Sequence, residues 1–460
     1  MEAFGVIGRQ SFPFFVMEQT MRALLSILWL LSLVPTFASA AEMTRKPNII
    51  LIMADDFGFE CVSANGGQSY QTPNLDKLAA SGVRFEHCHV QPLCTPTRVE
   101  LMTGKSNIRN YFRFGTLLKS EVTFGNILAK AGYATAVCGK WQLGTDKNLP
   151  QHFGFAESYL WQHTRRPPRY ANPGLEHNGR AIDFRNGEYG PLLVNDFALD
   201  FVTRHKDRPF FLYYPMILTH DPYQPTPDSP NWDPKAIGEQ VNRSPKHFAD
   251  MVAYMDKMVG RLVAKLEELK IREHTLILFL GDNGTGRTIT SRFRGQNYPG
   301  GKGTTTVRGT HVPLIVSWPS QVKHSRVNED LIGSVDILPT LCEAAGVAIP
   351  DGSDGRSFLP QLLGNKGTPR EWLYFWYSPR QQPDLTVREF VMDKQYKLYR
   401  GGGFFNYLAD PDEGKPLKPE EQQGQAAEAV LKLQKVLDQF RDARPTQLDR
   451  DLEQLMRKKG

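Results

Sequence analysis

Short apolar runs rich in β-branched and aromatic residues recur along this chain, and helical patterns separate them. Strands buried on both faces and joined through helices are typical of a parallel sheet with helices on both sides. The strands that we expect span residues 48–53, 134–138, 210–214, 275–280 and 312–317. The helices that we expect between them span residues 74–81, 124–131, 196–204 and 248–270. The sequence therefore predicts an α/β fold for most of the chain.

The pattern changes after about residue 345, where Gly- and Pro-rich linkage gives way to shorter elements. Short strands near residues 372–377, 389–392 and 396–399 precede a helix from about 419 to 441. We therefore expect an N-terminal extension over residues 1–40, an α/β domain over 41–345 and a smaller C-terminal α+β domain over 346–460. We also expect residues 151–190 and 219–247 to be long loops, which in a compact domain are usually functional.

The N-terminal extension carries the pattern of a secretory signal peptide. Arg22 precedes the apolar run Leu24–Leu33, and the small residues Ala38-Ser39-Ala40 follow it. The run is shorter than the roughly 20 residues that a spanning helix needs, so an uncleaved membrane anchor is only the alternative. We expect an exported protein, periplasmic or secreted, with no membrane association beyond this peptide.

The charge is mildly basic, with 55 Lys and Arg against 49 Asp and Glu, or +6. The basic residues are scattered, with no Arg-rich helix and no basic stripe with interleaved aromatics, so we expect no nucleic-acid partner. An anionic small-molecule substrate would suit this balance. The five cysteines are too few and too irregular for a disulfide scaffold, and Cys138 and Cys342 are predicted to be buried small apolar residues.

Polar residues follow four of the predicted strands directly or after a short loop. Ligands in open α/β sheets bind at the carboxyl ends of the strands, so we expect these residues to share one edge. They are Asp55, Asp56, Lys140, His220, Asp282 and Asn283.

Three carboxylates share a pocket in ionised form only when a cation is present, because like charges raise one another's pKa. All the candidate ligands are hard oxygens, which favours calcium or magnesium over zinc. The alternative is that Asp55-Asp56 and Asp282-Asn283 are ordinary turn residues after strands.

The segment Cys94-Thr95-Pro96-Thr97-Arg98 precedes Thr103-Gly104. Thr95 is predicted to cap a helix whose first residue is Pro96 and which Gly104 ends. Cys94 would then lie at the positive end of the helix, and Arg98 about one turn away. A helix N-terminus together with an arginine favours a tetrahedral anion, although a capped helix with an inert thiol would have the same spacing.

These residues resemble the type I sulfatases, whose signature is Cys-x-Pro-x-Arg. The likeness begins at Thr72-Pro73-Asn74-Leu75-Asp76 and Gly82-Val83-Arg84-Phe85, and it includes Cys94–Arg98 and Thr103-Gly104. Gly139-Lys140-Trp141-Gln142-Leu143-Gly144 resembles the second signature of the family. The likeness continues through His220-x-Pro222, Asp282-Asn283-Gly284 and Gly301-Lys302-Gly303-Thr304-Thr305, and covers about residues 46–345.

The resemblance implies an alkaline-phosphatase-like α/β sandwich and the hydrolysis of a sulfate ester. It implies that a formylglycine-generating enzyme oxidises Cys94 to formylglycine, whose hydrated aldehyde is the nucleophile. One calcium ion would bind Asp55, Asp56, Asp282 and Asn283 together with that hydrate. Arg98 would hold the hydrate, Lys140 and Lys302 would bind the sulfate oxygens, and His220 would contact the leaving-group oxygen.

Two positions depart from the family pattern. This chain has Gln142 where members usually carry His, and Arg308-Gly309-Thr310-His311 where a Glu-Gly-Gly-x-Arg-like run is usual. Glutamine cannot act as a base, so His311 is a candidate substitute, with a structural role as the alternative. His87 and His89 have the spacing of zinc ligands but lack a second cluster.

The substrate predicted from the resemblance is a sulfated carbohydrate or an aryl sulfate. The aromatic and Arg-rich segment from Tyr159 to Tyr170 is a candidate wall for a sugar pocket. A phosphodiester or phosphonate ester hydrolase on the same scaffold is one alternative, and an inactive sulfated-glycan-binding protein is another.

Overall fold

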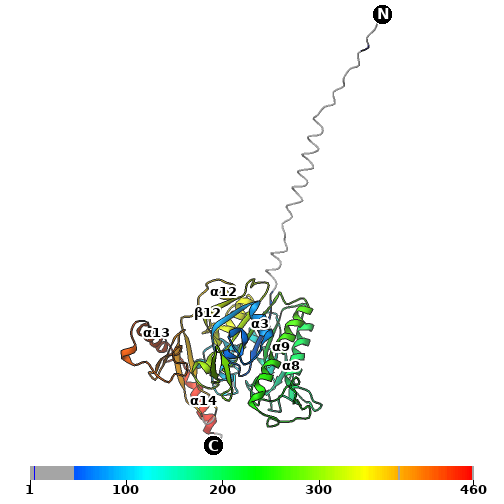
Figure 1. Ribbon diagram of the computed structural model, residues 1–460, viewed down its shortest axis with the longest axis horizontal. Coiled ribbons are helices and arrows are strands. Elements are labelled where there is room, and N and C mark those ends of the chain that lie inside the picture. The colour runs from blue at the N-terminus through cyan, green and yellow to red at the C-terminus, as the bar shows by residue number, and fades with distance from the viewer. Residues whose placement is uncertain (1–4, 6–45, 382–383, 458–460) are drawn as a thin grey trace. The chain divides into compact units, whose positions relative to one another are not determined.

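The computed structural model describes residue 5, residues 46–381 and residues 384–457. The predicted signal peptide, residues 22–40, lies outside the described residues. The described residues from 47 onward form one compact unit (Figure 1). Among the described residues, no helix is both long enough and apolar enough to cross a bilayer.

A ten-stranded sheet forms the centre of this unit, in the order β12-β2-β11-β8-β1-β7-β3-β4-β5-β6. Strands β8, β1, β7, β3 and β4 are parallel, whereas β11 runs antiparallel to both β8 and β2. The ten strands are β1 (Asn48–Ala54), β2 (Val83–His89), β3 (Ala134–Lys140), β4 (Glu157–Trp161), β5 (Gly174–His177), β6 (Arg180–Asp183), β7 (Phe210–Pro215), β8 (Thr275–Gly281), β11 (Leu314–Ser317) and β12 (Arg326–Gly333).

Helices cover both faces of this sheet. Alternate residues of β1 point to opposite sides, as strand geometry requires, and each set joins a separate apolar cluster. Ile49 and Leu51 pack on the side of α4 (Cys94–Thr103), α6 (Phe124–Lys130) and α11 (Ile337–Ala344). Ile50 and Ile52 pack on the side of α3 (Pro73–Ala80), α8 (Gly190–Arg204) and α9 (Phe248–Glu268). The predicted α/β sandwich is confirmed.

The central strands lie where the sequence predicts them, but the margins of the sheet differ. Residues 151–190 are not one long loop, because they contain α7 (Leu149–His152) in part, β4, and the β5–β6 hairpin. Residues 219–247 do form an irregular segment, with a single 3-10 turn at Pro245–His247. The small helices α5 (Asn107–Asn110), α10 (Val307–Thr310) and α12 (Leu359–Leu362) and the hairpin β9 (Thr290–Phe293) with β10 (Gln296–Pro299) complete this part.

A four-stranded antiparallel sheet follows in the C-terminal part, in the order β13-β14-β15-β16. Its strands are β13 (Leu373–Tyr377), β14 (Arg388–Met392), β15 (Tyr396–Tyr399) and β16 (Phe404–Asn406), and the first three match the expected strands. The predicted helix over 419–441 is shorter, as α13 (Gln425–Gln439), and α14 (Thr446–Arg457) follows it. The division into domains at residue 345 stays a prediction.

Candidate active site

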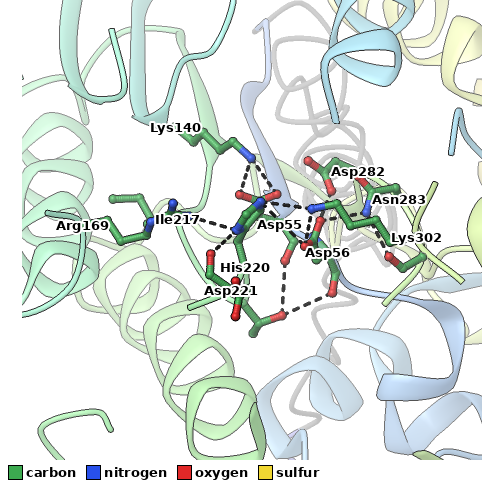
Figure 2. Close-up of polar contacts among 12 residues, drawn as sticks. Asp55, Asp56, Lys140, Arg169, Ile217, His220, Asp221, Asp282, Asn283 and Lys302 are labelled. Carbon is green, nitrogen blue, oxygen red and sulfur yellow. Dashed lines mark hydrogen bonds and ion pairs between the residues drawn. The ribbon is translucent and has the colours of Figure 1, made fainter. Parts of the chain in front are cut away.

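The strands that carry the predicted site residues are neighbours in the sheet. Strands β8, β1, β7 and β3 lie in that order and run parallel, so their carboxyl ends meet at one edge. Asp282, Asp55, His220 and Lys140 are delivered there, and Figure 2 shows their side chains gathered with Asp56, Asn283 and Lys302. The structure therefore brings the predicted strand-end residues together.

Asp55 and Lys140 form a buried ion pair. The ammonium of Lys140 donates to both Asp55 carboxylate oxygens, at 3.0 and 2.7 Å, and both side chains are at most 1% exposed. Burial acts to raise the pKa of Asp55, but the ammonium of Lys140 outweighs it together with other nearby cations, and the pKa lies below its ordinary value. Asp55 is therefore held as a carboxylate.

Asp56 links three further residues of the site. Lys302 Nζ donates to Asp56 Oδ2 at 2.6 Å, and Asn283 Nδ2 donates to Asp56 Oδ1 at 2.9 Å. The backbone amide of Asp56 donates to Asp282 Oδ1 at 3.0 Å. Burial and the neighbouring Asp55 raise the pKa of Asp282 to about 7. A second carboxylate beside Asp55 is thus costly to ionise while the cations present are protein side chains alone.

Cys94 is the first residue of α4 and is buried. Thr95 is not the helix cap, because the preceding Leu93 has the extended backbone of the N-cap and the Thr95 hydroxyl instead accepts a hydrogen bond from the amide of Gly115 at 3.2 Å. The helix ends at Gly104 as predicted, with φ at +65°. Burial raises the pKa of the Cys94 thiol, and the charges that act on it next are Lys140, Asp282, Lys302 and Asp55. The charges of the strand-end residues therefore act on the Cys94 thiol.

Arg98 ties α4 to two of the strands. Its guanidinium is completely buried and donates to Asp282 Oδ2 at 3.1 Å and to the carbonyl of Lys140 at 2.8 Å. Its Nε has no hydrogen-bond partner. Arg98 thus holds the helix that carries Cys94 against the edge of the sheet and keeps one donor free.

His220 lies between two cations. Its Nε2 is 3.1 Å from Lys302 Nζ and 3.8 Å from Asp56 Oδ2, and its Nδ1 is 3.0 Å from a nitrogen of Arg169. Burial and the charge of Lys302 hold the pKa of His220 well below its ordinary value. The imidazole is therefore neutral at physiological pH, with Nε2 facing the charged groups.

Arg169 is a residue that the sequence reasoning missed. Its side chain is 2% exposed, its guanidinium lies 4.1 Å from the ring centroid of Trp161, and it pairs with Glu239 at 2.8 Å. The only signal in the sequence is its place in the Arg-rich segment before Tyr170. Trp161 and Tyr170 are buried, whereas Arg166 in the same segment is exposed. That this segment walls a sugar pocket stays a prediction.

The oxygen-rich side of the site fits a hard divalent cation. One oxygen each of Asp55 and Asp56 and one ring nitrogen of His220 lie within 4.8 Å of one another. The Oδ1 atom of Asn283 is buried without a hydrogen-bond partner, as a ligand atom awaiting a cation would be. Carboxylate and amide oxygens are the ligands that calcium prefers.

Gln142 and His311, at the two positions that depart from the family pattern, have different surroundings. Gln142 lies two residues after the end of β3, has φ at +56° and buries an Oε1 without a hydrogen-bond partner. His311 instead stacks on Phe59, with ring centroids 4.0 Å apart, and on His89, at 4.9 Å, and its Nε2 contacts the carbonyl of Glu86 at 2.8 Å. These contacts give His311 and His89 a packing role in this structure.

Known proteins resemble this chain over most of its length. The sulfatase family model matches residues 47–347, and a model described as the C-terminal part of N-sulphoglucosamine sulphohydrolase matches residues 308–443. The chain belongs to the sulfatase family. Sulfatases are sulfuric ester hydrolases, so this sulfatase is an enzyme of that class.

Three relatives illustrate how far the likeness extends. Human arylsulfatase A is 32% identical over an alignment of 424 residues, which covers 83% of this sulfatase and 80% of the human protein. The N-acetylgalactosamine-6-sulfatase of Canis lupus familiaris is 32% identical over an alignment of 386 residues, which covers 75% of this sulfatase and 72% of the relative. A solved structure of a protein in complex with its substrate D-glucosamine-2-N,6-O-disulfate has the same fold, with a TM-score of 0.70, 22% identity and coverage of 86% and 99%. The predicted family and fold are confirmed.

Proposed function

We propose that this sulfatase hydrolyses the sulfate ester of a carbohydrate or an aryl alcohol, with formylglycine made from Cys94 as nucleophile and one calcium ion as cofactor. The observation that supports the proposal is that three carboxylates, three cationic side chains and the imidazole of His220 gather at one edge of the sheet. Four of these groups, Lys140, Asp282, Lys302 and Asp55, act electrostatically on the buried thiol of Cys94. Such a set matches a metal ion and a tetrahedral anion bound side by side.

The charges of the site balance those of its proposed ligands. Asp55, Asp56 and Asp282 with a divalent cation leave one negative charge. Arg98, Lys140 and Lys302 offset that charge and the single charge of a sulfate ester, and leave a net of one positive charge. An additional anionic group on the substrate is therefore not required for binding.

Each side chain has a role that its contacts allow. Lys140 and Lys302 bind the non-bridging sulfate oxygens, since both ammonium groups already contact carboxylates at this edge. His220 presents Nε2 to the leaving-group oxygen, because Nε2 is the ring nitrogen beside Lys302, which is proposed to bind the sulfate group. The formylglycine hydrate supplies the oxygen that attacks sulfur, and Arg98 holds α4 and the residue at position 94 in place.

Calcium would be held by Asp55, Asp56, Asp282 and Asn283. When bound, it neutralises the carboxylates and stabilises negative charge at the reacting oxygens. Asn283 would supply its amide oxygen, because the nitrogen of the same amide already donates to Asp56.

The maturation and location of the sulfatase belong to the same proposal. Formylglycine would be made by a formylglycine-generating enzyme, the one protein partner that the mechanism needs. The signal-peptide pattern at residues 22–40 supports export, to the periplasm or the medium. The names of the relatives support carbohydrate and aryl sulfates as substrates.

Replacement of the nucleophile tests the proposal. The Cys94→Ala variant should lose hydrolysis of a chromogenic aryl sulfate and of a 6-sulfated N-acetylhexosamine and should keep its melting temperature. The Cys342→Ala variant, which removes another fully buried cysteine, is the matched control and should keep its activity. Mass spectrometry of the peptide that contains residue 94 should find an aldehyde in place of the thiol.

Three results would contradict the proposal. Full activity of Cys94→Ala would exclude residue 94 as the source of the nucleophile. Faster hydrolysis of phosphodiesters or phosphonate esters than of sulfate esters would reassign the reaction. Tight binding of sulfated glycans with no turnover, in protein that carries the aldehyde, would make the chain an inactive binding protein.

A further inference from the structure

The loop over residues 301–306 places Lys302 in the site, and other parts of the chain form hydrogen bonds with its backbone. The amide of Gly303 donates to the carbonyl of Pro92, two residues before Cys94, at 2.9 Å. The hydroxyl of Tyr377 in β13 donates to the carbonyl of Gly303 at 3.3 Å. The loop therefore lies between the segment that precedes Cys94 and the C-terminal sheet.

A buried lysine of the C-terminal sheet makes the shortest of these contacts. Lys397 lies in β15, and its ammonium donates to the carbonyl of Thr305 at 2.7 Å and to a carboxylate oxygen of Glu413. The hydroxyl of Tyr399, two residues along the same strand, lies 2.8 Å from Thr305 Oγ1 and donates to the other carboxylate oxygen of Glu413 at 2.5 Å. We call Lys397, Tyr399 and Glu413 the Lys397 cluster. Two of its three members contact Thr305, three residues after Lys302.

The surroundings of the Lys397 cluster are apolar. The Lys397 side chain is 0% exposed and that of Glu413 is 5% exposed. The ammonium lies 4.7 Å from the ring centroid of Phe390 and 5.9 Å from those of Tyr399 and Tyr407. Val307, directly after the loop, packs into the same apolar cluster as Phe390.

A charge buried in such surroundings is costly unless it is paired and hydrogen-bonded, and an apolar side chain would fill the same space at lower cost. The ammonium instead fixes one backbone carbonyl of the loop. That carbonyl belongs to the segment whose lysine reaches Asp56 and His220, at 2.6 and 3.1 Å.

We propose that the Lys397 cluster is a positioning device that holds the 301–306 loop so that Lys302 meets the sulfate group. The C-terminal sheet thereby contributes to sulfate binding without touching the substrate. This inference rests on the proposed function, which assigns Lys302 to the sulfate oxygens.

Binding of inorganic sulfate by the full chain, measured by calorimetry, tests the inference. The Lys397→Met variant should bind sulfate about ten- to a hundredfold more weakly, as expected when a binding group is misplaced by about 1 Å. In a Lys302→Ala background the same substitution should cause no further loss, because the two residues act through one contact. A role in stability alone would give the same loss in both backgrounds and would overturn the inference.

Hydrogen exchange provides a second measurement, which does not depend on the reaction. The backbone amides of residues 303–306 should exchange faster in Lys397→Met than in the parent chain. The matched control is Lys432→Met, which removes another lysine of the C-terminal part that pairs with Asp393 at 2.7 Å and makes no hydrogen bond to the loop. That variant should match the parent in exchange at 303–306 and in sulfate affinity.

Two further variants cover the case in which Lys397→Met does not fold. Tyr399→Phe removes one hydroxyl from Thr305, and Lys397→Met with Glu413→Leu removes both charges together. Each should weaken sulfate binding and accelerate exchange in the loop, and unchanged exchange in both would overturn the inference. If the parent chain neither binds sulfate nor cleaves its esters, the proposed function fails, and the exchange result alone decides whether the cluster holds the loop.

Discussion

The buried ion pair of Asp336 with Arg370 and the active site differ in how completely their polar atoms are hydrogen-bonded. Asp336 accepts hydrogen bonds from Arg370 at 2.6 to 2.9 Å and from the amides of Gly333 and Arg356 at 2.9 and 2.7 Å. At the active site, by contrast, Arg98 Nε, Gln142 Oε1 and Asn283 Oδ1 are buried without partners. A structural ion pair satisfies its carboxylate within the protein, whereas the site keeps donors and acceptors for groups from outside.

The first prediction concerns Gln142, one of the active-site residues with an unpartnered polar atom. If the usual histidine expels sulfate from the enzyme, a glutamine slows that step by about 10² to 10⁴ in rate and leaves attack on sulfur intact. A chromogenic sulfate ester should then give a burst of about one equivalent before a slow phase, and Gln142→His should accelerate the slow phase.

The matched control for Gln142→His is Gln142→Met, which supplies no base and should leave the slow phase as it is. His152 and His163 are the other histidines near this segment, and each has a ring nitrogen engaged by a backbone carbonyl, of Lys119 and Asp146. A linear time course in the parent chain, with no burst, would show that the base is not missing.

The second prediction concerns the removal of the ion pair between Asp336 and Arg370. Arg370→Met leaves Asp336 buried and uncompensated, which should lower the free energy of unfolding by about 3–5 kcal/mol, with kcat unchanged. Arg109→Met is the control, since Arg109 is 40% exposed in its pair with Asp354 and should contribute less than about 1 kcal/mol. Denaturant unfolding of the two variants measures the difference, and equal losses would contradict the comparison.

The third prediction concerns the metal. Chelation should lower the melting temperature, because a ligand that binds only the folded state at about a hundred times its Kd contributes about 2.7 kcal/mol. Addition of calcium should restore the melting temperature. The Arg370→Met variant should show the same shift on chelation, since its cluster is separate. Rescue by zinc alone, or no shift at all, would count against a site of oxygen ligands.

The fourth prediction uses an intermediate case, Glu100, a buried carboxyl that accepts hydrogen bonds from Gln91, Asn107 and Ser334 but makes no ion pair. Burial raises its pKa to about 7. A raised carboxyl pKa stabilises the fold below the unfolded value, near 4.5, and this contribution is lost as the pH rises through 7.

We therefore expect the unfolding free energy of Glu100→Gln, relative to that of the parent chain, to rise by about 2 kcal/mol between pH 5 and pH 8. Thermal or denaturant unfolding of both proteins at the two pH values gives this difference. A pH-independent difference would mean that Glu100 is ionised throughout this range.

The sequence predicts the centre of this molecule better than its margins, for physical reasons. Strands β1, β7 and β8 are buried along their whole length and mostly apolar, because helices cover both of their faces. The carboxyl ends of these parallel strands must meet at one edge. The polar half of β12 lies at the edge of the sheet, where no apolar pattern marks a strand.

The supporting contacts of the site were beyond prediction from spacing. Arg169 reaches His220 across 51 residues and Lys397 reaches Thr305 across 92, and both contacts depend on how whole segments pack. The cap of α4 was mispredicted for a similar reason, since the hydroxyl of Thr95 is used by the distant amide of Gly115.

The burial of Asn283 has a consequence for producing this sulfatase. Asn283-Gly284-Thr285 is an acceptor sequence for N-linked glycans, and in the folded chain Asn283 is 0% exposed with its amide bonded to Asp56. A second acceptor sequence, Asn242-Arg243-Ser244, lies on the exposed surface. In a host that glycosylates chains before they fold, a sugar at Asn283 would obstruct the packing of β8 onto β1, whereas one at Asn242 would be tolerated. Recombinant production therefore calls for a host without N-glycosylation, or for the removal of that acceptor through Thr285.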